Sequence, residues 1–307
     1  MIPLTSKSKI LKPCSEDELL RLISKELPSP DEDVVTGIGD DCAVIRGFGK
    51  SGTLELLKTD ALVEGIHFAR GTPLPLVGWK ALCRPISDIA AMGGSPRHAM
   101  ITVAAPSTWG VTEWRGLYRG IGKAARAFGV SIVGGETVRS PNPLFLSVSL
   151  NGEVRKTHLR LRSGAKPGDL ICVTGKLGGS LRSGRHLRFQ PRIAEGAWLA
   201  SERGVTSMMD LSDGLGSDLP KLAKESRCSF RIAPDSLPLH KGCSTKEALS
   251  DGEDYELLVT IRPQLWPGIQ SRWAKASPDV ALTPIGMMLP SGALATVLPK
   301  GYDHLRP

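Results

Sequence analysis

The spacing of apolar residues predicts three helices in the first half of the chain. Residues 15–27 (SEDELLRLISKEL) repeat apolar positions at helical intervals after Ser15, a residue type that caps helix N-termini. Residues 76–92 and 112–129 carry the same kind of pattern, and each pattern stops at glycine. Pro85 lies inside the first of these two segments, so this helix is expected to be kinked or split there.

Short apolar runs predict the strands that lie between these helices. The runs over 42–46 and 53–59 flank a glycine-rich turn and predict an antiparallel pair. The run over 100–106 predicts a single strand, and the run over 130–135 predicts a strand that leads into a glycine loop. A further strand is predicted over 144–154 (LFLSVSLNGEV).

The second half of the chain continues the mixture of strands and helices. Residues 163–169 (SGAKPGD) mark a candidate domain boundary, and a strand is predicted over 170–175. A length of 307 residues indicates two domains, which we assign to 1–152 and 153–307. Because strands and helices alternate without a strict strand–helix–strand repeat, the predicted fold class is α+β and not a doubly wound sheet. Further elements in this half are helices over 191–203 and 215–226 and strands over 256–262 and 293–298.

Composition narrows the class of protein. The hydrophobic fraction of 41% and the charged fraction of 23% are typical of a globular protein with a core. No segment approaches the roughly 20 apolar residues that a membrane span needs, and the N-terminus mixes charged with apolar residues, unlike a signal peptide. We therefore expect a cytoplasmic protein. The six cysteines never pair as C-x-x-C, which favours buried thiols over a zinc site or a disulfide framework.

The formal charge of +8 leaves two interpretations open. The basic residues are scattered, and their densest groups lie at 155–166 and 181–192. They can form a solvated basic face, or they can attract a small polyanionic substrate. Only 5% of the residues are aromatic, so stacking platforms for single-stranded nucleic acid are scarce, and nucleic acid is not an expected partner.

Common catalytic motifs are absent from the sequence. Residues 47–53 (GFGKSGT) end like a phosphate-binding P-loop, but Val44 stands where that motif needs glycine, and a strand follows instead of a helix. Neither a G-x-S-x-G nucleophile elbow nor an H-E-x-x-H metal motif occurs. A hydrolase triad therefore has no visible nucleophile.

Acidic residues beside glycines or at strand ends are the most unusual feature. One such residue alone usually caps a helix or forms a turn, but six groups occur here. Carboxylates that come together repel one another unless protons or cations neutralise them, and oxygen ligands with few His or Cys suit Mg²⁺. Neighbouring glycines allow backbone N–H groups to approach a phosphate. The pattern predicts Mg²⁺-dependent phosphate chemistry. The six groups are Asp40-Asp41, Asp60, Asp88, Glu136, Asp210 with Asp213, and residues 251–254.

The same segments resemble the thiamine-monophosphate kinases, a family of the PurM-like superfamily that includes aminoimidazole ribonucleotide synthetase. The resemblance implies an N-terminal α+β domain that dimerises through its sheet, a C-terminal α+β domain, and a cleft for ATP and several Mg²⁺ ions. The implied reaction converts ATP and thiamine monophosphate into ADP and thiamine diphosphate. The matching stretches are GIGDDCAVI (37–45), KTDALVEGIHF (58–68), GWKALCRPISDIAAMGG (78–94), IVGGETVRSP (132–141), LRSGAKPGDLICVTG (161–175), MMDLSDGLGSDL (208–219), ALSDGEDYELL (248–258) and KGYDHL (300–305).

This resemblance also implies roles for individual residues. Catalysis would depend chiefly on Asp88, Asp213 and Arg162. The substrate contacts would be His67, Glu253 and Tyr302, the last suited to stacking on the thiamine rings. The ATP contacts would be Tyr118, Gly135, Glu136, Arg162 and Ser212. The Mg²⁺ ligands would be Asp40, Asp41, Thr59, Asp60, Asp88, Glu136, Asp210 and Asp213. Arg139 or Lys80 would join Arg162 in neutralising phosphate oxygens.

The sequence departs from the family pattern at several positions. Lys58 stands where a small hydroxyl residue is expected, and it could weaken one metal site or contact a phosphate. Arg84-Pro85 replaces Val-Asn, Glu136 replaces Asp, and Asp251 replaces glycine. None of these changes removes a principal Asp, so an active enzyme is expected. Two alternatives stay open: a PurM-like ATP-dependent enzyme with another acceptor, and an inactive paralogue that binds nucleotide or nucleic acid.

Overall fold

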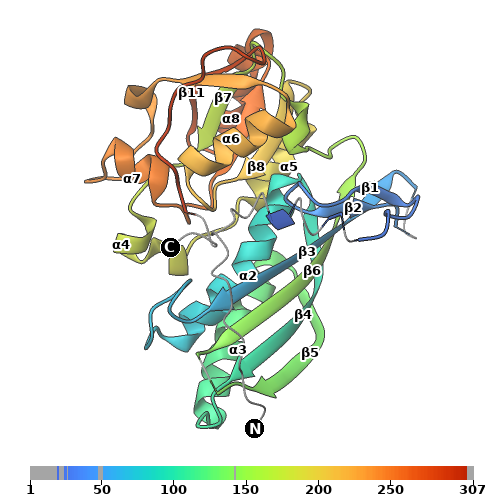
Figure 1. The fold of residues 1–307 in the computed structure, drawn as a ribbon, viewed down its shortest axis with the longest axis vertical. Coiled ribbons are helices and arrows are strands. Elements are labelled where there is room, and N and C mark those ends of the chain that lie inside the picture. Colours follow the sequence, from blue (N-terminus) through green and yellow to red (C-terminus); the bar gives the residue numbers. More distant parts are fainter. Residues whose placement is uncertain (1–18, 21–23, 26, 48–50, 142, 303–307) are drawn as a thin grey trace, which may run out of the picture.

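The computed structural model describes residues 19–20, 24–25, 27–47, 51–141 and 143–302. Two β-sheets follow one another along the chain, and helices pack against both of them (Figure 1). The predicted α+β fold class is thereby confirmed. The helix predicted over 15–27 lies largely outside the described residues, as does the middle of the glycine turn over 47–53.

The N-terminal half forms a six-stranded sheet with the order β1-β2-β3-β6-β4-β5. Its neighbouring strands pair antiparallel, except that β4 and β5 run parallel. The predicted antiparallel pair over 42–46 and 53–59 is confirmed as β2 and β3, which pair from Ala43 opposite Leu57. The strands are β1 (Val34–Thr36), β2 (Ala43–Ile45), β3 (Thr53–Val63), β4 (Ser95–Ala105), β5 (Ser131–Arg139) and β6 (Phe145–Arg155).

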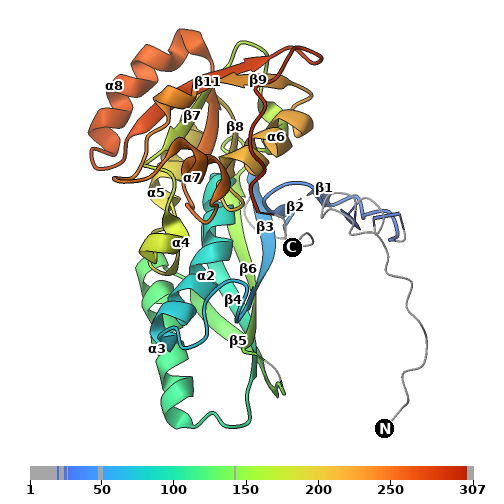
Figure 2. The ribbon, with the colours of Figure 1, turned by 60° about the vertical axis from the view of Figure 1, so that its left-hand side comes forward.

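Two long helices, α2 (Leu74–Ala91) and α3 (Val111–Phe128), cover one face of this sheet (Figure 2). They pack closely because glycines face backbone across the contact: a Cβ on Gly78 would lie 2.2 Å from the Leu117 carbonyl oxygen. Helix α2 continues through Pro85 and is not split there. Side chains of β3 alternate between an inward face, which includes buried Leu56 and Leu62, and an outward face that no helix of the described chain covers.

Strand β5 corrects one expectation. The strand was predicted to end in a glycine loop, but β5 continues without a break through Gly134 and Gly135 to Arg139. The reason is close strand pairing: a Cβ on Gly135 would lie 1.9 Å from the carbonyl oxygen of Ile101 in β4. The glycine therefore permits the strand to approach its neighbour. All nine residues of β5 are exposed.

The C-terminal half forms a five-stranded antiparallel sheet with the order β8-β10-β7-β11-β9. Its strands are β7 (Leu170–Thr174), β8 (Val205–Asp210), β9 (Ser229–Ile232), β10 (Leu257–Ile261) and β11 (Leu282–Leu289). Its helices are α4 (Ser180–Ser183), α5 (Ile193–Ser201), α6 (Leu215–Glu225), α7 (Thr245–Ser250) and α8 (Trp266–Ala276). Short 3-10 turns are η1 (Arg162–Gly164), η2 (Arg185–Leu187), η3 (Pro234–Ser236) and η4 (Pro263–Leu265).

The strand predicted over 293–298 is wrong. The last strand is β11, and the later segment makes only isolated hydrogen bonds to β9, such as Thr296 N to the Phe230 carbonyl at 3.1 Å. Leu294 and Val297 are 86% and 93% exposed, whereas Ala295 and Leu298 pack against the core, so the run touches the domain without forming a strand. The helices over 191–203 and 215–226 and the strand over 256–262 are confirmed as α5, α6 and β10.

Helix α2 joins the two halves of the molecule. Most of its buried residues belong to the core under the six-stranded sheet, whereas Ala91 belongs to the core formed with β8 and β10. Helix α5 crosses its C-terminal end so closely that a Cβ on Gly196 would lie 2.3 Å from the Ala90 carbonyl oxygen. The C-terminal turns of α2 are therefore held where the two sheets meet (Figure 1). Strand β6 runs to Arg155, across the assigned division at 152/153, and the division itself stays a prediction.

The helices also bear on membrane insertion. Within the described ranges, no helix combines the length and the apolar character that a membrane span requires.

Candidate active site

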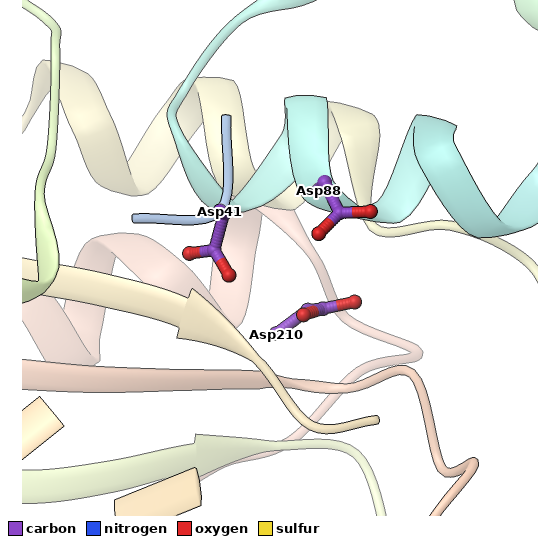
Figure 3. Close-up of side chains that lie close together, drawn as sticks. All are labelled: Asp41, Asp88 and Asp210. Atoms are coloured by element: carbon purple, nitrogen blue, oxygen red, sulfur yellow. The ribbon is translucent and has the colours of Figure 1, made fainter. Parts of the chain in front are cut away.

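Three acidic side chains meet at the junction of the two sheets. Asp41, Asp88 and Asp210 each place a carboxylate oxygen within 4.8 Å of the other two (Figure 3). They come from the loop before β2, from the C-terminal part of α2 and from the last residue of β8. All three are buried, with 2%, 7% and 3% of their surface exposed. Acidic groups far apart in sequence therefore converge in space.

A side chain of the described chain holds one oxygen of each of these three carboxylates. The Lys58 ammonium lies 2.7 Å from Asp88 Oδ1, and the Arg162 guanidinium donates to Asp41 Oδ1. The Asp210 carboxylate accepts a 2.7 Å hydrogen bond from the Ser87 hydroxyl. Asp41 Oδ2 is buried without any hydrogen-bond partner. An acceptor in that condition is costly unless a cation or a donor meets it.

The pKa values of these acids reflect crowding in a buried space. Burial, opposed by Lys58 and reinforced by neighbouring carboxylates, raises the pKa of Asp88 well above its ordinary value. Burial and the Asp41 charge raise the pKa of Asp210 to about 6. For Asp40, burial and the adjacent Asp41 raise the pKa to about 7. Full ionisation of the cluster therefore needs more positive charge than Lys58 and Arg162 supply.

This donor set fits a hard divalent cation. All three groups offer carboxylate oxygens, and one buried oxygen is unpartnered. Mg²⁺ prefers oxygen ligands and commonly uses one or two protein carboxylates together with phosphate oxygens. Asp41, Asp88 and Asp210 are therefore the residues of the described chain that could hold such an ion.

Asp60 lies beside this cluster. It shares the inward face of β3 with Lys58, and its Oδ1 lies 3.7 Å from a guanidinium nitrogen of Arg84. Its Oδ2 is buried without a partner. Arg84 also donates to the Ala61 carbonyl at 2.8 Å. Arg84, one of the departures from the family pattern, is therefore anchored at the edge of the carboxylate cluster.

The predicted substrate contacts line one pocket. His67, Glu253 and Tyr302 surround it with Ser212 and Asp213, although they are separated widely in sequence. The Tyr302 backbone N–H donates to the Asp213 carbonyl at 2.9 Å, which fixes the C-terminal segment against the loop after β8. The pocket is also lined by Ile66, Arg84, Leu181, Asp251 and Tyr255.

Glu253 is the most strongly held carboxylate of this pocket. Lys80, whose side chain is completely buried, donates to Glu253 Oε2, and His186 Nδ1 lies 2.9 Å from the same oxygen. Burial opposes ionisation, but the hydrogen bonds and charges of His186 and Lys80 lower the pKa of Glu253 to about 2. Glu253 is thus an anion throughout the physiological range.

The backbone around Glu253 is strained. Glu253 and Tyr255 adopt φ angles of 53° and 52°, which non-glycine residues seldom adopt. Phe189 stacks on Tyr255 with ring centroids 3.8 Å apart, and the buried Tyr255 hydroxyl has no hydrogen-bond partner. Strain of this kind is maintained by the surrounding packing and is common where a side chain must be aimed at a ligand.

Four residues expected at the site lie elsewhere in the chain. Thr59 points to the outward face of the six-stranded sheet, where its hydroxyl lies 3.4 Å from that of Ser149. Gly135 and Glu136 lie on the edge strand β5, three strands from β3 and so about 14 Å across the sheet. Tyr118 lies on α3 and is 40% exposed. Within a single copy of the described chain, these four residues therefore lie away from Asp41, Asp88 and Asp210.

The remaining predicted residues lie close to the cluster or the pocket. Asp40 Oδ2 accepts from the Arg162 backbone N–H at 3.1 Å. Asp213 forms an ion pair with Lys221 of α6 and is not a member of the cluster of Asp41, Asp88 and Asp210. The Ser212 backbone N–H donates to the Asp218 carboxylate. Burial and the nearby charge of Asp213 raise the pKa of Asp218 to about 8.

Sequence reasoning missed several functional neighbours. His186 and Lys221 carried no motif signal, and Tyr255 stood in the matching stretch over 248–258 without an assigned role. Lys80 was expected to meet phosphate oxygens, whereas it donates to Glu253 and to the His67 carbonyl. The sequence offers one retrospective signal for Lys80, because a lysine among apolar helix residues that face a core needs an anion nearby.

Three comparisons place the chain among known proteins. Residues 39–154 match the family described as "AIR synthase related protein, N-terminal domain". The thiamine-monophosphate kinase of Bacillus subtilis is 33% identical over 89% of this chain and 94% of that protein, and the Escherichia coli enzyme of the same name is 33% identical over 95% and 98%. The solved structure "AaThiL complexed with AMPPCP and TMP" superposes with a TM-score of 0.82 at 31% identity, covering 97% of this chain and 100% of that one.

The buried pair of Lys80 and Glu253 yields a stability prediction. The variant Glu253→Gln should lower the free energy of unfolding by about 3 kcal/mol, because it leaves the Lys80 ammonium buried without a counter-ion. In urea unfolding followed by circular dichroism, Lys80→Met with Glu253→Gln should lose less than the sum of the two single variants. Additive losses would show that the two side chains do not stabilise each other.

Proposed function

We propose, from the premise that this chain belongs to the thiamine-monophosphate kinase family and is a kinase, that it transfers the γ-phosphoryl group of ATP to thiamine monophosphate. The products would be thiamine diphosphate and ADP. The observation that carries the proposal is the convergence of Asp41, Asp88 and Asp210 beside a pocket lined by His67 and Glu253. Support comes from AaThiL, whose structure holds AMPPCP, an ATP analogue, and TMP.

The chemistry of the acceptor explains why no general base is needed. The second pKa of a phosphate monoester is about 6, so thiamine monophosphate is mostly dianionic at pH 7 and can attack without losing a proton to the enzyme. The obstacle is repulsion between two anions. Two groups of charge −2 at about 4 Å repel by roughly 4 kcal/mol even in water, and by more in a buried site. Neutralisation and in-line alignment are therefore the main tasks of the protein.

The carboxylate cluster would serve this neutralisation. Asp41, Asp88 and Asp210 would hold Mg²⁺, with Asp60 and Asp213 close enough in the fold to contribute to further ions. Bound Mg²⁺ would screen the charge of the phosphate groups and align them for transfer. Arg162, whose Nε is buried without a partner, would donate to a phosphate oxygen while its other end stays fixed to Asp41.

The pocket would recognise the organic part of the acceptor. Thiamine carries a permanently positive thiazolium ring, and the ionised Glu253 carboxylate offers the opposite charge. Both polar contacts that the described residues make to this carboxylate use Oε2, and Oε1 is available for the substrate. Tyr302, 45% exposed at the rim, would stack on a thiamine ring.

A homodimer would complete this arrangement. The outward face of the six-stranded sheet exposes the apolar side chains of Met100 on β4 and Val138 on the adjacent strand β5, and Leu57 of β3 lies on the same face. Exposed apolar patches next to an open sheet edge are typical of interaction surfaces. We propose that a second copy covers this face. The outward-facing Thr59 and the edge-strand Glu136 would then lie at the dimer interface.

The function is tested by product formation. Incubation with ATP, Mg²⁺ and thiamine monophosphate should yield thiamine diphosphate, detected by chromatography. Asp88→Asn and Asp210→Asn should each lower kcat at least about 100-fold, because each removes an ionised ligand from the cluster. Asp235→Asn, at an exposed position in η3, is the matched control. Wild-type rates in both cluster variants would refute the assigned metal roles, and ADP formation only with other acceptors would refute the substrate.

Lys58 yields a second prediction. Its ammonium occupies Asp88 Oδ1 at 2.7 Å and repels divalent cations, so Lys58→Met should bind Mn²⁺, used as a probe for Mg²⁺, about 10-fold more tightly. Electron paramagnetic resonance of free Mn²⁺ measures this affinity directly. Lys58→Arg keeps the charge and should bind as weakly as the wild type. Equal or weaker binding by Lys58→Met would mean that Lys58 does not compete with the ion.

The proposed dimer predicts a mass in solution. Analytical ultracentrifugation should give twice the mass of one chain. Met100→Lys should give a single-chain mass, because it buries a charge in the apolar face, and its circular dichroism spectrum should be unchanged because Met100 is 55% exposed. Val111→Lys, at a position 66% exposed at the start of α3, is the control. A dimer that persists in Met100→Lys would place the interface elsewhere.

A further inference from the structure

A second pocket lies between the N-terminal part of α2 and helix α3. It is formed between α2, α3 and the segment after η2, and its volume is about 390 Å³. None of the residues that line it lines the pocket around Glu253. A volume in this range is typical of sites for small organic ligands.

The wall of this pocket is apolar and fixed. Pro75, Leu76 and Leu187 contribute aliphatic surface, and Trp79 contributes an indole ring that is 6% exposed. The Trp79 Nε1–H donates to the Phe189 carbonyl at 2.9 Å, so the indole cannot rotate without losing a buried hydrogen bond. The pocket therefore has a preformed apolar wall, against which the ring of a ligand can pack.

The rim of the pocket is strongly basic. Arg119, Lys123 and Arg126 follow one another at helical spacing on α3, and Arg188 stands across from them. No acidic residue lines the pocket, and in the described part of the chain none of the four cations pairs with a carboxylate. The Lys123 ammonium lies over the Trp79 ring, 5.3 Å from its centroid, which brings a positive charge directly onto the apolar wall.

These observations specify the ligand class. An aromatic wall takes a ring, and four unpaired cations around one opening take an anion with several oxygens. We propose that this pocket is a binding site for a small aromatic phosphate monoester, separate from the catalytic pocket. The proposal stands on the geometry of this pocket and does not depend on the reaction assigned above.

The pocket is connected to Glu253 through one short segment. Leu187 and Arg188 line the pocket, whereas their neighbours His186 and Phe189 contact Glu253 and Tyr255 on the other side. The adjacent residues Trp79 and Lys80 are divided in the same way. Residues 186–189 therefore touch both pockets, and a shift of this segment on one side changes the contacts of Glu253 on the other. We infer that occupancy of this pocket changes the affinity for the catalytic-site ligand.

Calorimetry with 1-naphthyl phosphate tests the site. Binding should weaken about 10-fold in Lys123→Met and again about 10-fold in the double variant with Arg188→Met, because each change removes one charge-assisted contact. Lys275→Met, an exposed cation of α8, should bind as the wild type does. 1-Naphthylmethanol and inorganic phosphate should each bind at least about 10-fold more weakly than 1-naphthyl phosphate.

Two results would overturn the site. The first is equal affinity for 1-naphthyl phosphate in the wild type, Lys123→Met and the double variant. The second is equal affinity of the wild type for 1-naphthylmethanol, since an anion site must prefer the anion. Unchanged melting temperatures of the variants establish that a lost affinity is not lost folding.

The connection to Glu253 has its own measurement, and this part alone rests on the proposed function. The Kd of thiamine monophosphate should change by at least 5-fold, that is by about 1 kcal/mol, when 1-naphthyl phosphate is saturating, and Lys123→Met should reduce the change. An unchanged Kd would refute the coupling. If thiamine monophosphate does not bind at all, the proposed function fails, while the first titration still decides the second site.

Discussion

Repulsion between buried acids is the constraint on which the rest of this structure depends. Three carboxylates from distant segments lie within 4.8 Å of one another, and in the described part of the chain only Lys58 and Arg162 form ion pairs with them. Two positive charges face three buried acids, so protonation of an acid is favoured until a further cation enters, and the raised pKa values of Asp88 and Asp210 reflect this. The excess of acids over cations is stabilised when a ligand completes the site. The positions of α2, the loop before β2 and the end of β8 therefore serve a common electrostatic purpose.

The cations around this cluster distinguish the chain from the pattern of its family. Lys58 and Arg84 stand where uncharged residues are expected, and the structure anchors both on acids, the first on Asp88 and the second on Asp60. Each supplies permanently fixed positive charge close to where anionic groups would meet. Side chains of the protein thus neutralise part of the negative charge. The concentration of divalent ions that the site needs should therefore differ from that needed by relatives that lack these side chains.

Local sequence patterns predicted the helices and strands that carry the site. Features that depend on contacts between distant segments could not be predicted from them. The apolar period over 76–92 gave α2, and the glycine-flanked acids indicated the Asp41, Asp88 and Asp210 cluster. The predicted end of β5 was wrong, because Gly135 allows the strand to pair closely with β4. The sequence of β5 alone does not show which strand lies beside it. The contact of His186 with Glu253 joins residues 67 positions apart without any motif. Whether a β-like run becomes a strand likewise depends on regular pairing with a partner, and residues 293–298 make only isolated hydrogen bonds to β9.

Helix α2 belongs to two hydrophobic cores at once, and this has a mechanical consequence. Asp88 lies two residues before Ala90, whose carbonyl oxygen leaves no space for a side chain on Gly196 of α5. A single methyl group at position 196, outside both pockets, would push on the last turn of α2, close to the Asp88 carboxylate. The register of one helix–helix crossing therefore contributes to the spacing of the three buried acids, because α2 cannot shift towards α5 without a clash.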